Sequence, residues 1–280
     1  MECINDFYLH NFRFRSCKEF DDNLLTKGTA IYEVIKIENG IPVFIEDHLN
    51  RLFDSADSYR VNINESYCDI ETLIDELIKK NKVTEGKIKL IIRFDDLKGN
   101  SEKDLLIYFT PYLFPNNEEY EDGVEVGLCN AVRLNPNAKV YNTEARKKAN
   151  NRIVEEKLYE VLLMNKDGFV TEGSRSNIFF IQNDKVITPP VYDVLNGITR
   201  KHLINICKQN SIDLTEDRIH YSDLSNVDCA FLSGTSIKVL PVKSIGNNPF
   251  DTKNKILRKI MKLYDLAVFA YLNSKINLTS

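Results

Sequence analysis

The first residue whose setting suggests chemistry is Glu172, at the end of an apolar run in the second half of the chain. It lies in V-T-E-G-S-R-S-N-I-F-F, residues 170–180, just after a hairpin signal, N-K-D-G at 165–168. Carboxylates are rarely buried without a partner. We therefore expect Glu172 to face a positively charged group, because packing alone does not explain an acid in this place.

Two short turns are candidate sites for an anion. G-I-T-R at 197–200 places Gly and Thr at the entrance to an expected helix, where backbone N–H groups, a hydroxyl and the helix dipole favour negative charge. S-G-T-S at 233–236 is a second hydroxyl-rich turn, after an expected strand. Each turn also has an ordinary structural interpretation, and a Thr that caps a helix after a Gly turn is the commoner use of such a sequence.

Two basic residues complete the set. Arg51 lies on the apolar side of an expected helix, between Leu49 and Leu52. A guanidinium there could hold a phosphate through paired hydrogen bonds, and a plain salt bridge explains it equally well. Lys139 has no acid within three residues on either side, which suits a reactive amine and also an ordinary surface lysine.

One reactive amine, one buried carboxylate and three phosphate-type contacts together match the requirements of pyridoxal 5′-phosphate. The aldehyde of this cofactor needs a lysine, and its phosphate needs donors. Its pyridine nitrogen needs an acid partner in order to stay protonated and draw electrons. The sequence therefore indicates a site for this cofactor, although each signal alone is weak.

Hydrophobic periodicity indicates the elements that must position these residues. In the first half we expect a hairpin turn, E-N-G at 38–40, and a small α/β domain over residues 1–113, with strands at 31–36, 42–45, 87–93 and 105–110 and helices at 46–56 and about 70–78. Residues 114–120 are turn-rich and acidic, which is typical of a linker.

The larger domain, expected over residues 121–280, would carry the cofactor. It is predicted to contain strands at 124–129 and 229–232, the hairpin with Glu172, and helices at 143–157, after residue 200 and at about 253–272. The last helix is apolar around most of its circumference after Leu263, which predicts core packing or a subunit interface.

Composition limits the class of protein. The 280 residues are 43% hydrophobic and 28% charged, with a net charge of −4, so a soluble globular protein is expected and nucleic-acid binding is not. Six scattered cysteines form no metal-ligand pattern, and a disulfide framework is not expected. The charged start and the lack of a long apolar run favour a reduced, cytoplasmic setting.

The chain resembles the class IV aminotransferases, which are fold type IV pyridoxal-phosphate enzymes. This family includes branched-chain amino acid aminotransferases, D-amino acid transaminases and aminodeoxychorismate lyase. The resemblance extends from about Tyr32 to Val242, and its blocks are I-Y-E-V-I-K, H-L-N-R-L, the Lys139 region, V-T-E-G-S-R-S-N-I-F-F, T-P-P with L-N-G-I-T-R, and F-L-S-G-T-S…L-P-V. It implies a two-domain α/β (α+β) fold and a homodimer.

The resemblance also assigns roles. Lys139 would form the Schiff base and move a proton between Cα and C4′; Lys147 and Lys148 fit this role less well. Glu172 would partner the pyridine nitrogen, and Asn177 would support its turn. The remaining cofactor contacts would be Leu195 against the ring and Arg51, Ile198, Thr199 and Thr235 at the phosphate.

The substrate is defined less sharply than the cofactor. Tyr32, in Tyr-Glu-Val, is typical of the aminotransferases, whereas the lyase carries Thr at the position of Val34. The Arg-x-His pair of D-amino acid transaminases is missing from L-K-G-N at 97–100, where Lys98 is either a weaker substitute or a solvated loop lysine. The Gly-Asn-Tyr typical of branched-chain enzymes after the lysine is replaced by Y-N-T-E at 141–144.

We therefore expect an aminotransferase that moves an amino group between a small amino acid, of branched-chain type or a D-amino acid, and a 2-oxo acid. Tyr32 and Lys98 are its candidate substrate contacts. Two other functions are retained. One is a 4-amino-4-deoxychorismate lyase that releases pyruvate, and the other is a protein that binds the cofactor without catalysis.

Overall fold

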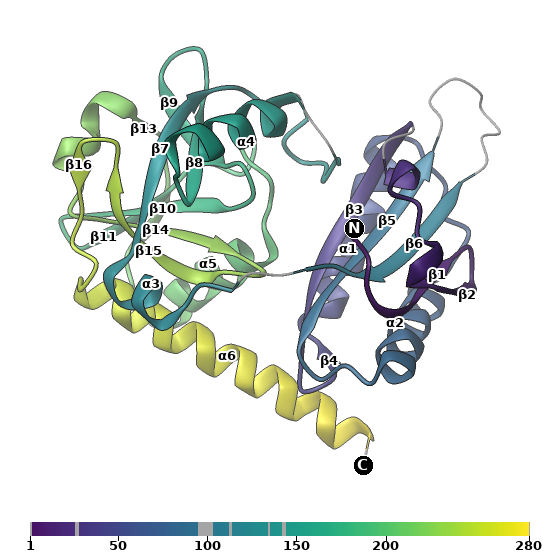
Figure 1. Ribbon diagram of the computed structural model, residues 1–280. Coiled ribbons are helices and arrows are strands. Elements are labelled where there is room, and N and C mark those ends of the chain that lie inside the picture. Colours follow the sequence, from purple (N-terminus) through teal and green to yellow (C-terminus); the bar gives the residue numbers. More distant parts are fainter. Residues whose placement is uncertain are drawn as a thin grey trace. The chain divides into compact units, whose positions relative to one another are not determined.

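The computed structural model describes residues 2–25, 28–94, 103–111, 114–133, 135–141 and 144–279 (Figure 1). The chain divides into two compact units. Unit 1 comprises Met1–Leu113, Ala138–Tyr141 and Val268–Ser280, and unit 2 comprises Phe114–Asn137 and Asn142–Ala267.

Unit 1 is built on an antiparallel sheet. Within the described residues its six strands follow the order β2-β1-β6-β5-β3-β4. Their bounds are β1 Ile4–His10, β2 Arg13–Ser16, β3 Thr29–Glu38, β4 Ile41–Pro42, β5 Gly86–Phe94 and β6 Asp104–Phe109. The E-N-G turn is confirmed between β3 and β4, where Asn39 and Gly40 both have positive φ, of 54° and 75°, as a tight hairpin turn requires.

Two helices pack on one face of this sheet, α1 (Ile45–Ser58) and α2 (Tyr67–Asn81). Their apolar positions recur every three or four residues and join the sheet in a single buried cluster. A capping box starts α2, because the Ser66 hydroxyl accepts from the Asp69 N–H at 3.2 Å and the Asp69 carboxylate accepts from the Ser66 N–H at 2.9 Å. Both predicted helices are confirmed.

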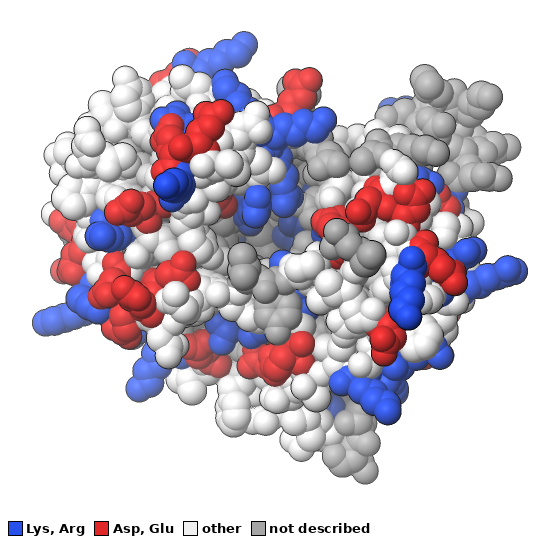
Figure 2. All heavy atoms as spheres, in the orientation of Figure 1, with Lys and Arg blue, Asp and Glu red and all other residues white. Residues whose placement is uncertain are grey.

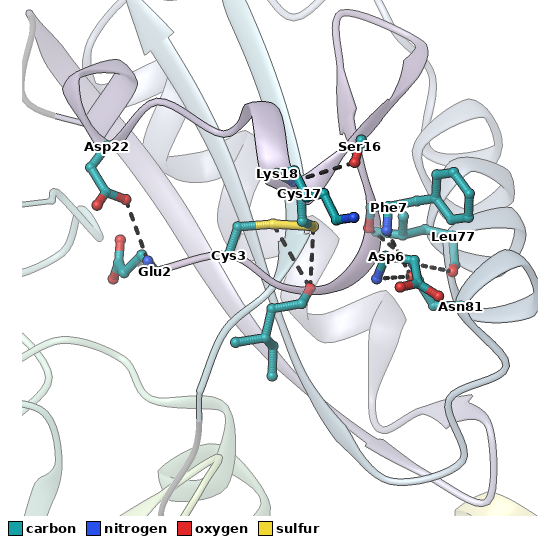
Figure 3. Close-up of a disulfide and its surroundings, with 11 residues drawn as sticks. Glu2, Cys3, Asp6, Phe7, Ser16, Cys17, Lys18, Asp22, Leu77 and Asn81 are labelled. Carbon is teal, nitrogen blue, oxygen red and sulfur yellow. Dashed lines mark hydrogen bonds between the residues drawn. A yellow bond between two sulfur atoms is a disulfide. The ribbon is translucent and has the colours of Figure 1, made fainter.

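The opposite face of the sheet is covered by the N-terminal segment, including the short 3-10 helices η1 (Cys17–Glu19) and η2 (Asp22–Leu25). The apolar side chains on this face include Tyr8, Phe20 and Tyr32. The sequence did not predict this segment, nor the disulfide between Cys3 and Cys17, whose Cα atoms are 6.0 Å apart (Figure 3). The expectation of wholly reduced cysteines is therefore corrected for this pair, which is brought together by the turn from β1 through β2 into η1.

Unit 2 contains a mixed sheet of ten strands among its described residues, in the order β12-β11-β10-β14-β15-β7-β8-β9-β13, with β16 beside β15. The β15–β7, β7–β8 and β11–β12 pairs are parallel. The strand bounds are β7 Val124–Asn130, β8 Glu160–Met164, β9 Phe169–Gly173, β10 Asn177–Gln182, β11 Lys185–Thr188, β12 Leu214–Glu216, β13 Ile219–His220, β14 Cys229–Gly234, β15 Lys238–Ile245 and β16 Asn248–Pro249.

The remaining helices are α3 Asn117–Asp122, α4 Glu144–Glu156, α5 Ile198–Gln209, η3 Tyr221–Asn226 and α6 Lys255–Thr279. The hairpin expected at 165–168 joins β8 to β9. The side chain of Asn165 accepts from the N–H groups of Asp167 and Phe169, at 3.1 and 2.9 Å, and Gly168 has a φ of +82°. The turn residues therefore fix the start of β9, the strand that carries Glu172.

Three segments differ from the sequence-based domain division. Residues 117–122 lie partly in the predicted linker but form helix α3, because Asn116 and Glu119 make a capping box. The segment Ala138–Tyr141 belongs to unit 1 and not to the larger unit, since Val140 forms a β-bridge with Ile31. Residues of α6 after Ala267 also belong to unit 1.

The surface carries both signs of charge. Figure 2 shows lysine and arginine side chains interspersed with aspartate and glutamate side chains over the visible face, as the small net charge of −4 suggests. In the part of the chain that the structure describes, every helix is too short or too polar to cross a lipid bilayer.

The core of unit 2 allows a matched stability test. Leu203 of α5 is fully buried, whereas Leu266 of α6 is 53% exposed. Leu203→Ala is expected to lower the free energy of unfolding by about 2–5 kcal/mol, because it removes buried apolar area and leaves a cavity. Leu266→Ala is expected to change it by less than about 1 kcal/mol. Urea denaturation measures both, and equal losses would contradict this assignment of the core.

Candidate active site

Lys139 is held against strand β3 of unit 1. The Tyr32 N–H donates to the Lys139 carbonyl at 3.0 Å, and the Tyr141 N–H donates to the Ala30 carbonyl at 2.8 Å. The Lys139 N–H donates to Ser55 Oγ at 3.3 Å, and its half-buried ammonium lies 4.8 Å from the centre of the Tyr32 ring. Lys139 is therefore not an ordinary surface lysine: its backbone is fixed, and its amine is held at an aromatic face.

Arg51 forms an ion pair that the sequence left open as one of two possibilities. Its Nε and Nη2 donate to the two oxygens of Glu33, each at 2.7 Å, and His48 Nδ1 lies 2.7 Å from Glu33 Oε2. All three side chains are buried. Burial raises the pKa of Glu33, but the charge of Arg51 and the hydrogen bonds from Arg51 and His48 outweigh it and lower the pKa to about 2. Burial lowers the pKa of His48.

Glu172, at the end of β9 in unit 2, has the cationic partner that its burial requires. The residue is 2% exposed. Arg133 Nε donates to Glu172 Oε1 at 2.8 Å, and the Leu195 N–H donates to Oε2 at 3.2 Å. A positively charged partner was expected, but sequence reasoning did not find Arg133, which follows β7 in no recognisable motif and lies 39 positions away.

The loop after Glu172 is arranged around a second buried carboxylate, Glu160, on β8. Its oxygens accept from the N–H and hydroxyl of Ser174, at 3.2 and 2.7 Å, from the Arg175 N–H at 3.1 Å and from the Ser176 hydroxyl at 3.2 Å. A Cβ on Gly173 would lie 2.1 Å from Ser176 Oγ, so only Gly fits in this loop. Sequence reasoning missed Glu160, because a single acid in a strand carries no signal of the donors that surround it.

Asn177 holds the segment before α5 and is connected to Glu172 through Leu195. Its Nδ2 donates to the Leu195 carbonyl at 2.8 Å, and the Leu195 N–H in turn holds Glu172. A Cβ on Gly197 would lie 2.1 Å from Asn177 Oδ1. The close approach of Gly197 to Asn177 thus sets where helix α5 begins.

The start of α5 has the features of an anion site. Gly197 is the N-cap and makes no side-chain capping bond, and the first turn contains no acid. Ile198 and Thr199 are buried there, and Thr199 Oγ1 lies 3.4 Å from the Tyr264 hydroxyl. Arg200 is turned elsewhere, since its Nη2 donates to the Pro189 carbonyl at 2.9 Å and to Glu216 at 2.7 Å.

The second hydroxyl-rich turn lies beside this region in unit 2. Ser233 pairs with Asn177 across β14 and β10, and Thr235 follows the end of β14. The buried Ser233 Oγ has no hydrogen-bond partner among the described residues. A buried hydroxyl of this kind normally needs an acceptor or a donor, so it fits a polar ligand at this strand end.

Each unit thus gathers part of the predicted set. Unit 1 brings Tyr32, Lys139 and the Arg51 ion pair to β3 and α1. Unit 2 brings together Glu172 and Leu195, with Ile198 and Thr199 at the adjoining helix start and Thr235 after β14. Lys98 lies outside the described residues. Within those residues, no group of three His, Cys, Asp or Glu side chains is placed to hold a metal ion.

The family model for amino-transferase class IV matches residues 30–245, and the chain belongs to this family. It is an aminotransferase with a mixed α/β fold, as the motifs implied. The family's enzymes use pyridoxal 5′-phosphate in general.

Two relatives illustrate the similarity. The chain is 29% identical over 238 residues to the D-alanine aminotransferase of Bacillus licheniformis, covering 81% of this chain and 82% of that protein. It is 31% identical over 243 residues to a probable branched-chain-amino-acid aminotransferase of Aquifex aeolicus, covering 79% and 76%.

Two solved structures are also similar. A T.th. branched-chain amino acid aminotransferase with pyridoxamine 5′-phosphate superposes with a TM-score of 0.87 at 22% identity, over 96% of each chain. A putative 4-amino-4-deoxychorismate lyase from Legionella pneumophila superposes with a TM-score of 0.78 at 25% identity, over 88% of this chain and 93% of that one. The fold is therefore that of the class IV aminotransferases.

The Glu33 ion pair predicts a pH dependence of stability. Because the pKa of Glu33 is lowered from 4.5 to about 2 in the folded protein, its contribution is complete above the unfolded value and is lost as the pH falls through about 2. Wild-type protein is expected to lose more unfolding free energy between pH 5 and pH 2.5 than Glu33→Gln. Urea denaturation at each pH gives this difference, and identical losses would contradict the ionised pair.

The contact between Gly197 and Asn177 predicts a steric effect. Gly197→Ala is expected to cost about 1–3 kcal/mol of stability, because the new Cβ displaces Asn177 or the start of α5. Gly234→Ala is the control, since its Cβ would meet no atom closer than 3.4 Å. Thermal unfolding compares the two, and adding Asn177→Gly to Gly197→Ala should restore part of the loss.

Proposed function

We propose that this chain is a pyridoxal-phosphate-dependent aminotransferase that moves an amino group between a small amino acid and a 2-oxo acid. The observation that carries the proposal is Glu172. It is a buried carboxylate held on one oxygen by Arg133 and on the other by the Leu195 N–H. Such a fixed acid suits a protonated pyridine nitrogen, and an arginine partner stabilises its charged form.

The residues present fit the cofactor. Lys139 would bind its aldehyde carbon, and the uncapped start of α5 at Ile198 and Thr199, with Thr235, would donate to its phosphate. Leu195 would lie against its ring. Arg51 would lie at the phosphate, with its guanidinium plane held in one orientation by Glu33. The bound cofactor supplies an electron sink for the substrate's Cα.

The chain's own groups perform the proton transfer. The Lys139 amine would take the proton from the substrate's Cα and return it at C4′, acting as general base and then as general acid. The Tyr32 ring, in contact with this amine, would keep it positioned between the two carbons. Glu172, fixed by Arg133, would hold the proton on the pyridine nitrogen.

We infer the substrate class from the relatives. Branched-chain-type amino acids and D-amino acids are the candidates, since the relatives described above are named for them. Tyr32 and Lys98 stay the proposed substrate contacts. A homodimer is proposed from the family, and Phe269 of α6, 63% exposed, offers apolar surface for a second copy. A cytoplasmic location stays a prediction.

The visible spectrum of the cofactor-loaded protein tests this function. A single L- or D-amino acid is expected to convert the lysine-bound band to that of the amine form, and the active enantiomer then defines the stereochemistry. Lys139→Ala should abolish both the lysine-bound band and its conversion. Lys147→Ala, on the exposed face of α4, should leave both unchanged.

Glu172→Gln should lower kcat by about a hundredfold or more. A band that no amino acid changes would contradict the proposal.

The runner-up function is the 4-amino-4-deoxychorismate lyase. The similarity to the putative lyase from Legionella pneumophila keeps it open. It predicts pyruvate release from aminodeoxychorismate without any amino acceptor. A lactate dehydrogenase-coupled assay detects that product, and its absence would remove this function.

A further inference from the structure

The two edges of the unit 2 sheet are joined by a short link that contains Arg218. Among the described residues, β12 is the outermost strand beside β11, and β13 is the outermost strand at the other end, beside β9. Only Asp217 and Arg218 separate these two edge strands in the sequence. The sheet therefore curls round until its outermost strands are neighbours.

The residues proposed to hold the cofactor ring lie on the two sides of this link. Strand β9, beside β13, carries Glu172, and β11, beside β12, runs into the segment 189–197, which carries Leu195. The buried contact between the two sides is the Leu195 N–H, which donates to Glu172 Oε2 at 3.2 Å. The geometry of this contact therefore depends on how firmly β9 and the segment 189–197 are held together.

Arg218 contacts both sides from the surface. Its Nε and Nη2 donate to the two carboxylate oxygens of Asp193, at 2.7 and 3.1 Å, within the segment 189–197. Its guanidinium carbon lies 5.5 Å from the ring centre of Tyr192, in the same segment, and 5.8 Å from that of Phe169, the first residue of β9. One guanidinium thus connects β9 to the segment 189–197 through a forked ion pair and two ring contacts.

The other contacts of this link hold only the start of the segment. The Asp217 N–H donates to the carbonyl of the last residue of β11 at 3.0 Å, and the Val191 N–H donates to Glu216 at 3.0 Å. Neither contact reaches the residues next to Leu195. The ion pair of Arg218 does, because its acceptor lies two residues before Leu195 in the sequence.

Stability alone does not account for this arrangement. The side chains of Arg218 and Asp193 are 42% and 19% exposed, and an exposed ion pair adds little to the free energy of folding. A guanidinium with two hydrogen bonds and two ring contacts nevertheless has a defined orientation. It can therefore set a distance between two segments even where it adds little stability.

We propose that Arg218 is a positioning residue for the cofactor, which acts by fixing the distance between Glu172 and Leu195. It acts through Asp193 and Phe169 and needs no contact with the cofactor itself. The inference rests on the function proposed above, which assigns Glu172 to the pyridine nitrogen and Leu195 to the ring. Without Arg218, the segment with Leu195 would move more freely against β9, and the Glu172 carboxylate would lose one of its two donors for part of the time.

Amide hydrogen exchange tests the positioning directly, because it needs no bound cofactor. In Arg218→Ala, the peptide of residues 191–197 should exchange about tenfold faster than in wild type, since the Leu195 N–H is less often hydrogen-bonded. Arg152→Ala is the matched control. Arg152 pairs with Glu156 on α4 in the same unit and is 43% exposed, so its loss should leave this peptide unchanged. Equal exchange of the peptide in all three proteins would overturn the proposal.

Cofactor affinity and kinetics separate positioning from plain stability. Arg218→Ala should raise the Kd of pyridoxal 5′-phosphate by about three- to tenfold and lower kcat by a similar factor, with the KM of the amino acid changed by less than about twofold. Arg152→Ala should leave all three constants unchanged. A lower Tm for Arg218→Ala, with an unchanged cofactor Kd and kcat, would refute the positioning role and leave a surface ion pair.

Further variants of the pair keep the test decisive if Arg218→Ala folds poorly. Arg218→Lys keeps the charge but not the planar fork, so it should recover only part of the cofactor affinity. Asp193→Asn should raise the cofactor Kd in the same direction as Arg218→Ala. The double variant Asp193→Ala/Arg218→Ala should lose no more affinity than Arg218→Ala alone, because the two residues act as a pair. Fully additive losses would contradict this coupling.

Failure of the proposed function gives a different pattern. In wild type, no amino acid would then change the cofactor band. The difference in hydrogen exchange between Arg218→Ala and Arg152→Ala would persist, because it reports the contact of Leu195 with Glu172 and not the reaction.

Discussion

A carboxylate that is removed from water must be matched by donors, and this requirement arranges most of the candidate site. Among the described residues three glutamates are buried, Glu33, Glu160 and Glu172. Each is surrounded in a different way: Glu33 by a guanidinium and an imidazole, Glu160 by the hydroxyls and N–H groups of one loop, and Glu172 by a guanidinium and one N–H. The hydrogen-bond donors that these three carboxylates require determine where the side chains of the candidate site lie.

In unit 2, the contacts of the two buried glutamates, Glu160 and Glu172, lie next to one another along the chain. Glu160 shapes the loop that follows Glu172, and Glu172 is tied to Leu195, which Asn177 also holds. The start of α5 follows two residues later, at Gly197. A change in any one of these contacts is therefore transmitted to the others through short, directional hydrogen bonds. The same logic holds in unit 1, where Glu33 fixes the plane of Arg51.

The sequence predicted what local patterns determine. Turn residues gave the hairpins at 38–40 and 165–168, apolar periodicity gave α1 and α2, and the burial of Glu172 required a cation. The family motifs added the assignment of Lys139 and Glu172, which composition or periodicity alone does not supply. Each of these signals lies within a few residues of the feature that it predicts.

What sequence reasoning missed depends on pairings between distant positions. Arg133 meets Glu172 across 39 positions, and the segment with Lys139 joins β3 more than a hundred residues before it. The hydrogen-bond donors around the Glu2 carboxylate meet only when β5, β6 and the segment with Tyr141 are assembled, and the pairing of Cys3 with Cys17 depends on the path of the chain through β1 and β2 into η1. No local preference encodes these contacts, because tertiary packing decides which side chains face one another.

The glycine after Glu172 has a consequence for how this loop can evolve. Gly173 leaves room for Ser176 Oγ, and the same hydroxyl donates to Glu160. A side chain at 173 would push that hydroxyl away and leave a buried carboxylate short of a donor. The tolerance of position 173 for a side chain is therefore set by the donors that Glu160 needs, and a larger residue there requires a change at 176 as well.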